Sequence, residues 1–223
     1  MKKIVFVVLS IVFLMAGMVQ ADTFVLPSSG QTTTGVTIVD PSGAGPLSTV
    51  AGLFNVTYNG QNYQAFCTDY ATVNWDVTYT NYKMIAIPPL AAYSEAAYIF
   101  NKYGNINGAL AQIAIWEVVF EQLSAGGNAS TVQQGVNQGK FYVTSAGGLN
   151  LATADTWVAD ALANGNNFDV SGYSLVVSPM EGQYYGVENQ DFIVKNPVPE
   201  PTSMLLLGLG LIGLAGIRRK FKS

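Results

Sequence analysis

Two residues of this chain have side chains that could form a covalent bond with each other. Cys67 is the only cysteine among the 223 residues. Gln112 lies within a nearly uninterrupted apolar stretch that spans residues 108–123. A helix that is apolar all round is buried, and a buried amide needs a hydrogen-bonding partner. Gln112 is therefore either hydrogen-bonded to nearby backbone or paired covalently with Cys67.

The segments around both residues resemble a known pair of motifs. Residues 112–116, Gln-Ile-Ala-Ile-Trp, are similar to the Gln-x-Ala-Ile-Trp signature of the thioester domains of Gram-positive surface adhesins. Residues 63–70, Tyr-Gln-Ala-Phe-Cys-Thr-Asp-Tyr, are similar to the family's upstream motif, a cysteine at the end of a strand between aromatic residues. In that family the cysteine and the glutamine condense, with loss of ammonia, into an internal thioester.

The resemblance covers roughly residues 55–123 and places Cys67 and Gln112 at the two bonded positions. The chain departs from the family pattern at Ala111, where threonine is usual, and at Thr68, where an aromatic residue is common. Neither position supplies a bonded atom, but both adjoin the bond. The resemblance also implies a helical insert between β segments.

A thioester would require precise positioning, because a carboxamide is a poor acyl donor and a thiolate must be held against it. Once formed, the bond must be shielded from water, and a lysine amine of a partner could then attack the stored acyl group. The alternative is that Cys67 is a small buried hydrophobic residue. The candidate shielding residues are Tyr63, Phe66, Tyr70 and Trp116, and the candidate proton relays or capping groups are Asp69 and Glu117.

Both ends of the chain have the composition of targeting segments. Residues 1–21 combine two lysines, an apolar core and a small-residue cleavage site, which is typical of a secretory signal peptide. Residues 198–223 resemble a PEP-CTERM sorting signal: Pro199-Glu200-Pro201, an apolar run over residues 204–217, and the basic residues Arg218 and Arg219. In such signals an exosortase-type membrane enzyme cuts near the Pro-Glu-Pro motif.

The apolar run near the C-terminus is short for a permanent membrane anchor. Its length as a helix is about 21 Å, against a hydrocarbon core of about 30 Å. The basic residues that follow it would hold the tail on the cytoplasmic side. We therefore expect transient membrane contact through this transmembrane helix, followed by release to the cell surface or extracellular matrix.

Removing the two ends leaves a strongly acidic chain. Residues 22–200 contain four lysines against all fourteen acidic residues, a net charge of −10. A surface of this charge repels nucleic acid and anionic lipid. One cysteine in an exported chain cannot form an internal disulfide, which favours a special use of Cys67.

The pattern of the middle region predicts an α+β fold, a mainly antiparallel sheet or sandwich with a helical lobe inserted at about residues 90–164. Asn59-Gly60 indicates a tight hairpin turn, so that Cys67 ends a hairpin strand. Asn107 and Thr153 are the predicted N-caps of two helices. The predicted strands are 35–39, 53–58, 61–66, 73–87, 173–177, 183–187 and 191–195, and the predicted helices are 90–103, 108–123, 130–139 and 153–164.

The chain has no histidine, which excludes Ser-His-Asp catalysis and histidine-ligated metal sites. We expect no catalytic residues, no metal, no cofactor and no enzymatic turnover. The sequence predicts an exported domain, residues 22–197, with a thioester for covalent attachment to an amine-bearing partner. The alternative is a non-covalent matrix or carbohydrate-binding protein with a buried free cysteine; a hydrolytic enzyme has less support, because no acid–base pair stands out.

Overall fold

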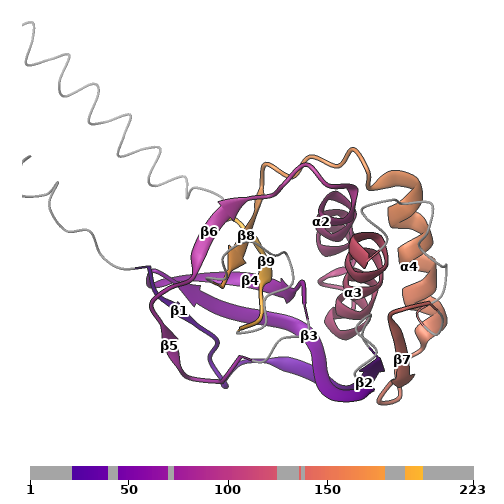
Figure 1. Cartoon of the computed structure of the whole chain (residues 1–223), viewed down its shortest axis with the longest axis horizontal. Helices are drawn as coiled ribbons and strands as arrows, with labels where there is room; N and C mark the ends of the chain where they lie inside the picture. Colours follow the sequence, from indigo (N-terminus) through magenta and orange to yellow (C-terminus); the bar gives the residue numbers. More distant parts are fainter. Residues whose placement is uncertain are drawn as a thin grey trace, which may run out of the picture.

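The computed structural model describes residues 22–39, 45–69, 73–124, 136, 139–178 and 189–197, which form an antiparallel sheet beside a group of helices (Figure 1). The predicted α+β class is thereby confirmed. The strands are β1 Phe24–Val25, β2 Thr32–Val39, β3 Pro46–Tyr58, β4 Gln61–Cys67, β5 Thr78–Tyr79, β6 Lys83–Ala86, β7 Tyr142–Ser145, β8 Tyr173–Val177 and β9 Phe192–Lys195. The helices are α2 Ala91–Tyr103, α3 Gly108–Ser124 and α4 Leu151–Asn164.

The sheet is built around the long strand β3, which changes partners halfway along. Its first half pairs with β2, from Pro46 opposite Val39 to Leu53 opposite Thr32. Its second half pairs with β4 through the hairpin at Asn59-Gly60, where φ is 50° and 76°. These positive φ angles match the two-residue turn that the sequence predicts. The strand order is β5-β1-β3-β4-β9-β8-β6, with β2 pairing β3 and β7.

Three helices pack against one another beside the sheet, and α3 contacts β3 and β4 directly (Figure 1). The side chains of α3 from Ala109 to Gln122 are all buried, as its lack of a polar face predicts. Asn107 caps this helix as predicted, since its Oδ1 accepts a hydrogen bond of 3.1 Å from the N–H of Leu110. The sequence therefore located the helix that carries Gln112 and its first turn correctly.

Several predicted elements differ from the structure. Residues 73–87 form only the short strands β5 and β6, because Asp76 adopts φ of 60° and donates its N–H to Leu26 O, which breaks the strand. Helix α4 begins at Leu151 with Asn150 in the N-cap position, so the prediction of Thr153 as the cap was wrong. Strand β7 was not predicted, because four residues carry too little periodicity. Strand 183–187, most of helix 130–139, and both terminal segments lie outside the described residues.

Candidate functional site

Cys67 and Gln112 meet where β3 and β4 separate. Strand β4 pairs with β3 only as far as Ala65, but with β9 as far as Cys67. Backbone groups of successive strand residues alternate between the two edges of the strand. Because the N–H of Thr68 bonds to Asp191 O on the β9 side, the N–H and C=O of Cys67 face the edge that β3 has left.

The side-chain amide of Gln112 takes the place of the missing strand at this edge. The N–H of Cys67 donates to Gln112 Oε1 at 2.8 Å, and Gln112 Nε2 donates to Cys67 O at 2.8 Å. These two hydrogen bonds close a ring that places the carboxamide carbon, Cδ, opposite the Cα of Cys67. The structure thus brings together the two residues of the motif pair, 45 positions apart in the chain.

The site excludes solvent almost completely. Cys67 is 1% exposed and Gln112 is fully buried. Burial, with a further contribution from the carboxylate of Asp69, raises the pKa of the Cys67 thiol well above its usual value. Side chains directly opposite each other in a ladder share a face, so the thiol lies on the same face of the sheet as Phe192. At neutral pH the sulfur is therefore a buried thiol.

Trp116 makes a second connection from the same helix, to the segment that directly follows β4. It lies one turn after Gln112, and its Nε1 donates to Asp69 O at 3.2 Å. One helical turn advances about 5.4 Å and two strand residues about 6.7 Å, so residues i and i+4 of α3 match residues j and j+2 of the chain. The spacing of the motif pair therefore has a geometric basis.

Two residues that the sequence did not single out complete this connection. Gln190 donates its Nε2 to Asp69 O at 3.0 Å, and the N–H of Asp191 donates to Asp69 Oδ2 at 2.9 Å. Tyr82 in turn donates its hydroxyl to Gln190 O at 2.8 Å. Asp69 is thus held by contacts up to 122 positions away, for which no local pattern gives a signal.

The predicted shielding residues are not all near the sulfur. Phe66 is buried, but it points to the opposite face of β4 and packs edge-on against Phe100 of α2 at 4.8 Å. Tyr63 is partly exposed and lies four strand residues, about 13 Å, before Cys67. Trp116 is fully buried beside the site. Tyr70 lies outside the described residues.

Glu117 is directed away from the pair. It follows Gln112 by five positions, which is about 140° around a helix. Its carboxylate lies near Glu121 and Asp155, and both of its oxygens lack a hydrogen-bond partner among the described residues. Burial, followed by the repulsion of those two acids, raises the pKa of Glu117 to about 9. Its buried carboxyl therefore holds a proton at neutral pH.

Comparison with known proteins identifies only the end of the chain. Residues 197–220 match the family model described as the PEP-CTERM protein-sorting motif. This match indicates an exported protein that an exosortase-type enzyme processes and that is anchored at the cell envelope. No curated protein and no solved structure matches the chain.

The sorting residues Pro199, Glu200, Pro201, Arg218 and Arg219, and the expected transmembrane helix, lie outside the described residues. Within the described ranges, no helix has both the length and the hydropathy needed to cross a membrane. The same ranges hold no cluster of three or more acidic or cysteine side chains suited to a metal ion.

Proposed function

We propose that this exported protein carries an internal thioester between Cys67 and Gln112, which it uses once to attach covalently to an amine-bearing partner at the cell surface or in the extracellular matrix. The observation that carries this proposal is the pair of hydrogen bonds between the Gln112 amide and the backbone of Cys67. They hold the electrophilic carbon beside the backbone of Cys67, in a buried site.

The bond would form by acyl transfer within the chain. Cys67 Sγ attacks Gln112 Cδ, the Cδ–Nε2 bond breaks, and the nitrogen leaves as ammonia with the thiol proton. Asp69, whose charge acts on the thiol, is the group we assign to accept that proton first. The later reaction with an amine forms an amide at Cδ and releases the thiol of Cys67.

The backbone of Cys67 would assist both steps. Its N–H already donates to Gln112 Oε1, the oxygen on which negative charge develops when a nucleophile attacks Cδ. The hydrogen bond that Gln112 Nε2 donates to Cys67 O holds the leaving nitrogen on the opposite side of the ring. Positioning of this kind would supplement the proton transfer assigned to Asp69.

The same hydrogen bonds are also consistent with a second, non-covalent function, in which they serve only to stabilise the fold. The Gln112 amide satisfies the last unpaired backbone groups of β4, which is a sufficient structural role. The raised pKa of Cys67 also disfavours the thiolate. In that case the protein is a non-covalent matrix or carbohydrate-binding protein, and Cys67 is part of the core.

Intact mass of the exported protein distinguishes the two functions. We expect a mass lower than the processed sequence by one ammonia, and no alkylation of Cys67 after rapid unfolding. Methylamine should restore alkylation and leave a methylamide at residue 112, because the amine expels the thiolate. A full sequence mass with a readily alkylated Cys67, in protein never exposed to amines, would establish the non-covalent function instead.

Three variants serve as controls for that measurement. Cys67→Ala and Gln112→Glu should each abolish the mass deficit, since the first lacks the nucleophile and the second has no amide nitrogen to lose. Gln122→Ala is the matched control, because Gln122 is a fully buried glutamine of the same helix. It should retain the deficit.

A further inference from the structure

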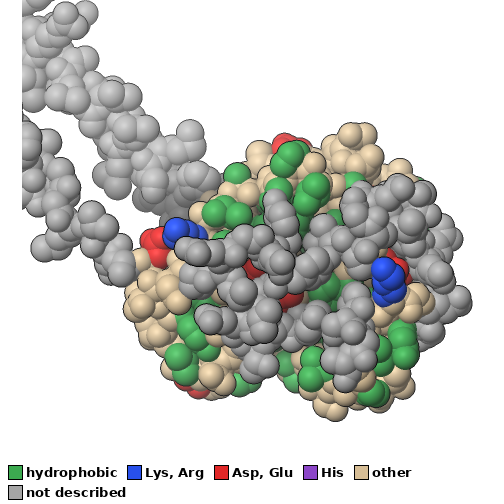
Figure 2. Space-filling view, viewed as in Figure 1, with side chains coloured by type: hydrophobic (Ala, Val, Ile, Leu, Met, Phe, Trp, Pro, Cys, Tyr) green, Lys and Arg blue, Asp and Glu red, His purple; other side chains and the backbone are tan. Residues whose placement is uncertain are grey.

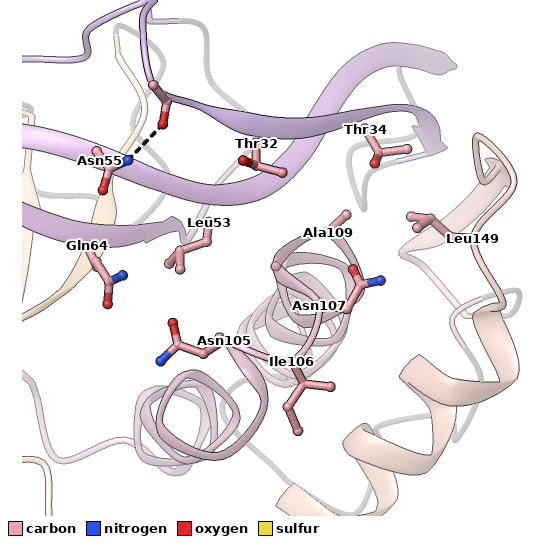
Figure 3. A pocket seen from close by; sticks show the side chains of 13 residues that line it. Thr32, Thr34, Leu53, Asn55, Gln64, Asn105, Ile106, Asn107, Ala109 and Leu149 are labelled. Carbon is pink, nitrogen blue, oxygen red and sulfur yellow. Dashed lines mark hydrogen bonds between the residues drawn. The ribbon is translucent and has the colours of Figure 1, made fainter.

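A groove opens beside the first turn of α3, close to the Cys67–Gln112 pair. Its volume is about 460 Å³, within the range of small-ligand sites. It includes Gly108 and Ala109, four and three positions before Gln112, and Gln64, three before Cys67. Figure 3 shows strand residues along one side of the groove, the start of α3 along the other, and Leu149 at one end.

Close packing between α3 and β3 creates this groove. A Cβ on Gly108 would lie 2.6 Å from the backbone nitrogen of Leu53, so only glycine lets the helix begin this close to the strand. The side chains on the α2–α3 junction thereby face those on β2, β3 and β4 (Figure 3). Residues from five separate segments converge on one site.

The polar lining of the groove is entirely uncharged. It combines hydroxyl and carboxamide groups, which supply both hydrogen-bond donors and acceptors. Apolar surface comes from Leu53, Leu149 and Ile106, the last of which is 70% exposed. The six polar side chains that line the groove are Thr32, Thr34, Asn55, Gln64, Asn105 and Asn107.

Several of these groups are available to a ligand. Within the described part of the chain, the amides of Gln64 and Asn105 make no side-chain hydrogen bond, and they lie near each other at one end of the groove (Figure 3). Asn107 uses its Oδ1 to cap α3, and Asn55 uses its Nδ2 on Gly30 O. The Nδ2 of Asn107 and the Oδ1 of Asn55 are left to bind a ligand.

We propose that this groove binds a neutral oligosaccharide. Vicinal hydroxyl groups both donate and accept hydrogen bonds, which matches paired amides and hydroxyls, and the C–H faces of a sugar ring match Ile106 and Leu149. The assignment goes beyond the thioester and does not require it. The groove adjoins the helical turn before Gln112, but neither Gln112 nor Cys67 lines it.

Other ligand classes fit the lining less well. The groove has no lysine or arginine to pair with an anion and no carboxylate to bind a cation. Figure 2 shows a neutral character over much of the described surface on the face in view, and only 11% of the chain is charged. A peptide strand is usually bound by an open sheet edge or by deep apolar pockets, whereas this groove offers dispersed amides and hydroxyls.

Titration of the ¹⁵N-labelled protein by NMR tests the proposal. The probes are a β-1,4-linked glucose tetramer and a β-1,4-linked N-acetylglucosamine tetramer. We expect saturable shifts of the side-chain amides of Gln64, Asn105 and Asn107. Gln64→Ala and Asn105→Ala should each weaken binding about five- to ten-fold, as expected for losing one or two hydrogen bonds.

Two controls make the result specific. Asn167→Ala removes an exposed amide outside the groove and should leave the affinity unchanged. Cys67→Ala should also bind normally, so that failure of the thioester proposal would not affect this one. The proposal would be overturned if neither tetramer shifts the groove amides at millimolar concentration, or if only a heparin tetramer or a neutral Gly-Ser-Asn-Thr peptide does so.

Discussion

At the scale of single residues, the site depends on an amide that replaces a strand. Gln112 supplies one acceptor and one donor to Cys67, at 2.8 Å each, where β4 has lost its neighbour β3. A buried backbone pair left without partners would destabilise the fold, so the intact amide has a structural role. Thioester formation would release Nε2 and with it the hydrogen bond to Cys67 O. The same hydrogen bonds give the acyl carbon its position.

The titration of Glu117 should change the free energy of unfolding with pH. Its pKa is raised from 4.5 to about 9 by burial and by Glu121 and Asp155, so the folded protein keeps a proton that the unfolded chain loses above about pH 4.5. We therefore expect the Glu117 contribution to be fully present at low pH and to be lost as pH rises towards 9. Urea denaturation across pH 5–9 measures this change.

Glu117→Gln should flatten that pH dependence, because glutamine resembles the protonated acid and does not titrate. At pH 5 the variant should differ from the wild type by less than about 1 kcal/mol, and its relative stability should increase with pH. Asp169→Asn is the control, since the pKa of this exposed aspartate is lowered by its contacts with Ser171 and it stays ionised throughout the range. Parallel wild-type and Glu117→Gln curves would contradict the argument.

At the scale of elements, α3 is the helix that positions the site. Its first turn packs on β3, Gln112 and Trp116 attach it to the chain at Cys67 and Asp69, and its end packs on α2. At the α2–α3 contact, Gln122 Nε2 donates to Glu95, whose pKa is raised to about 7 by burial. A shift of the helix along its axis would move all of these contacts together.

Gly108→Ala tests how far the site depends on that packing. The new Cβ would lie 2.6 Å from Leu53 N and 2.8 Å from Leu53 Cβ, so the first turn of α3 must move away from β3. We expect the free energy of unfolding to fall by about 1–3 kcal/mol, the usual cost of overpacking. If the thioester forms, the fraction of protein with the mass deficit should fall as well.

Gly35→Ala is the matched control for this substitution. Gly35 also lies at a contact between elements, on β2, but an added Cβ would have nothing within 4 Å. Its effect should stay within about 0.5–1 kcal/mol. Equal destabilisation by the two substitutions in denaturant titrations would show that close packing at Gly108 is unimportant.

At the scale of the whole molecule, the sequence predicts an acidic exported domain between two targeting segments, of which the C-terminal one matches a known sorting motif. The sorting motif at residues 197–220 indicates processing by an exosortase-type enzyme at the cell envelope. Six of the ten basic residues lie in the two ends, and residues 22–200 have a net charge of −10, from four lysines and fourteen acids. Removal of both ends would therefore leave a protein with an excess of acidic residues.

Mapping the terminal peptides of protein from the cell surface or medium tests this organisation. We expect the mature chain to begin near Asp22 and to end near Pro199-Glu200-Pro201, because cleavage follows the small-residue site and the sorting motif. Protein from a strain that lacks the exosortase provides the control and should retain the C-terminal segment. Recovery of peptides containing Arg218 and Arg219 from the wild-type extracellular fraction would exclude processing at the motif.

The sequence alone determined the features that depend on local chemistry. The Asn59-Gly60 hairpin, the buried helix α3 with its Asn107 cap, strand β8 and the sorting motif were each predicted from neighbouring residues, because turn conformation, capping and periodicity are local properties. The pairing of Cys67 with Gln112 came from a resemblance between motifs. The residues next to Cys67 and Gln112 in the sequence would not, without that resemblance, distinguish a covalent pair from a buried thiol and a buried amide.

Only the tertiary structure decided how those parts form a site. The change of partners along β3, the role of the Gln112 amide as a substitute for a strand, and the hold of Gln190 and Asp191 on Asp69 all join segments far apart in the chain. It also placed Phe66 on the opposite face from the sulfur and directed Glu117 towards Asp155. Strand pairing and side-chain direction depend on which elements pack together, and no local pattern encodes that choice.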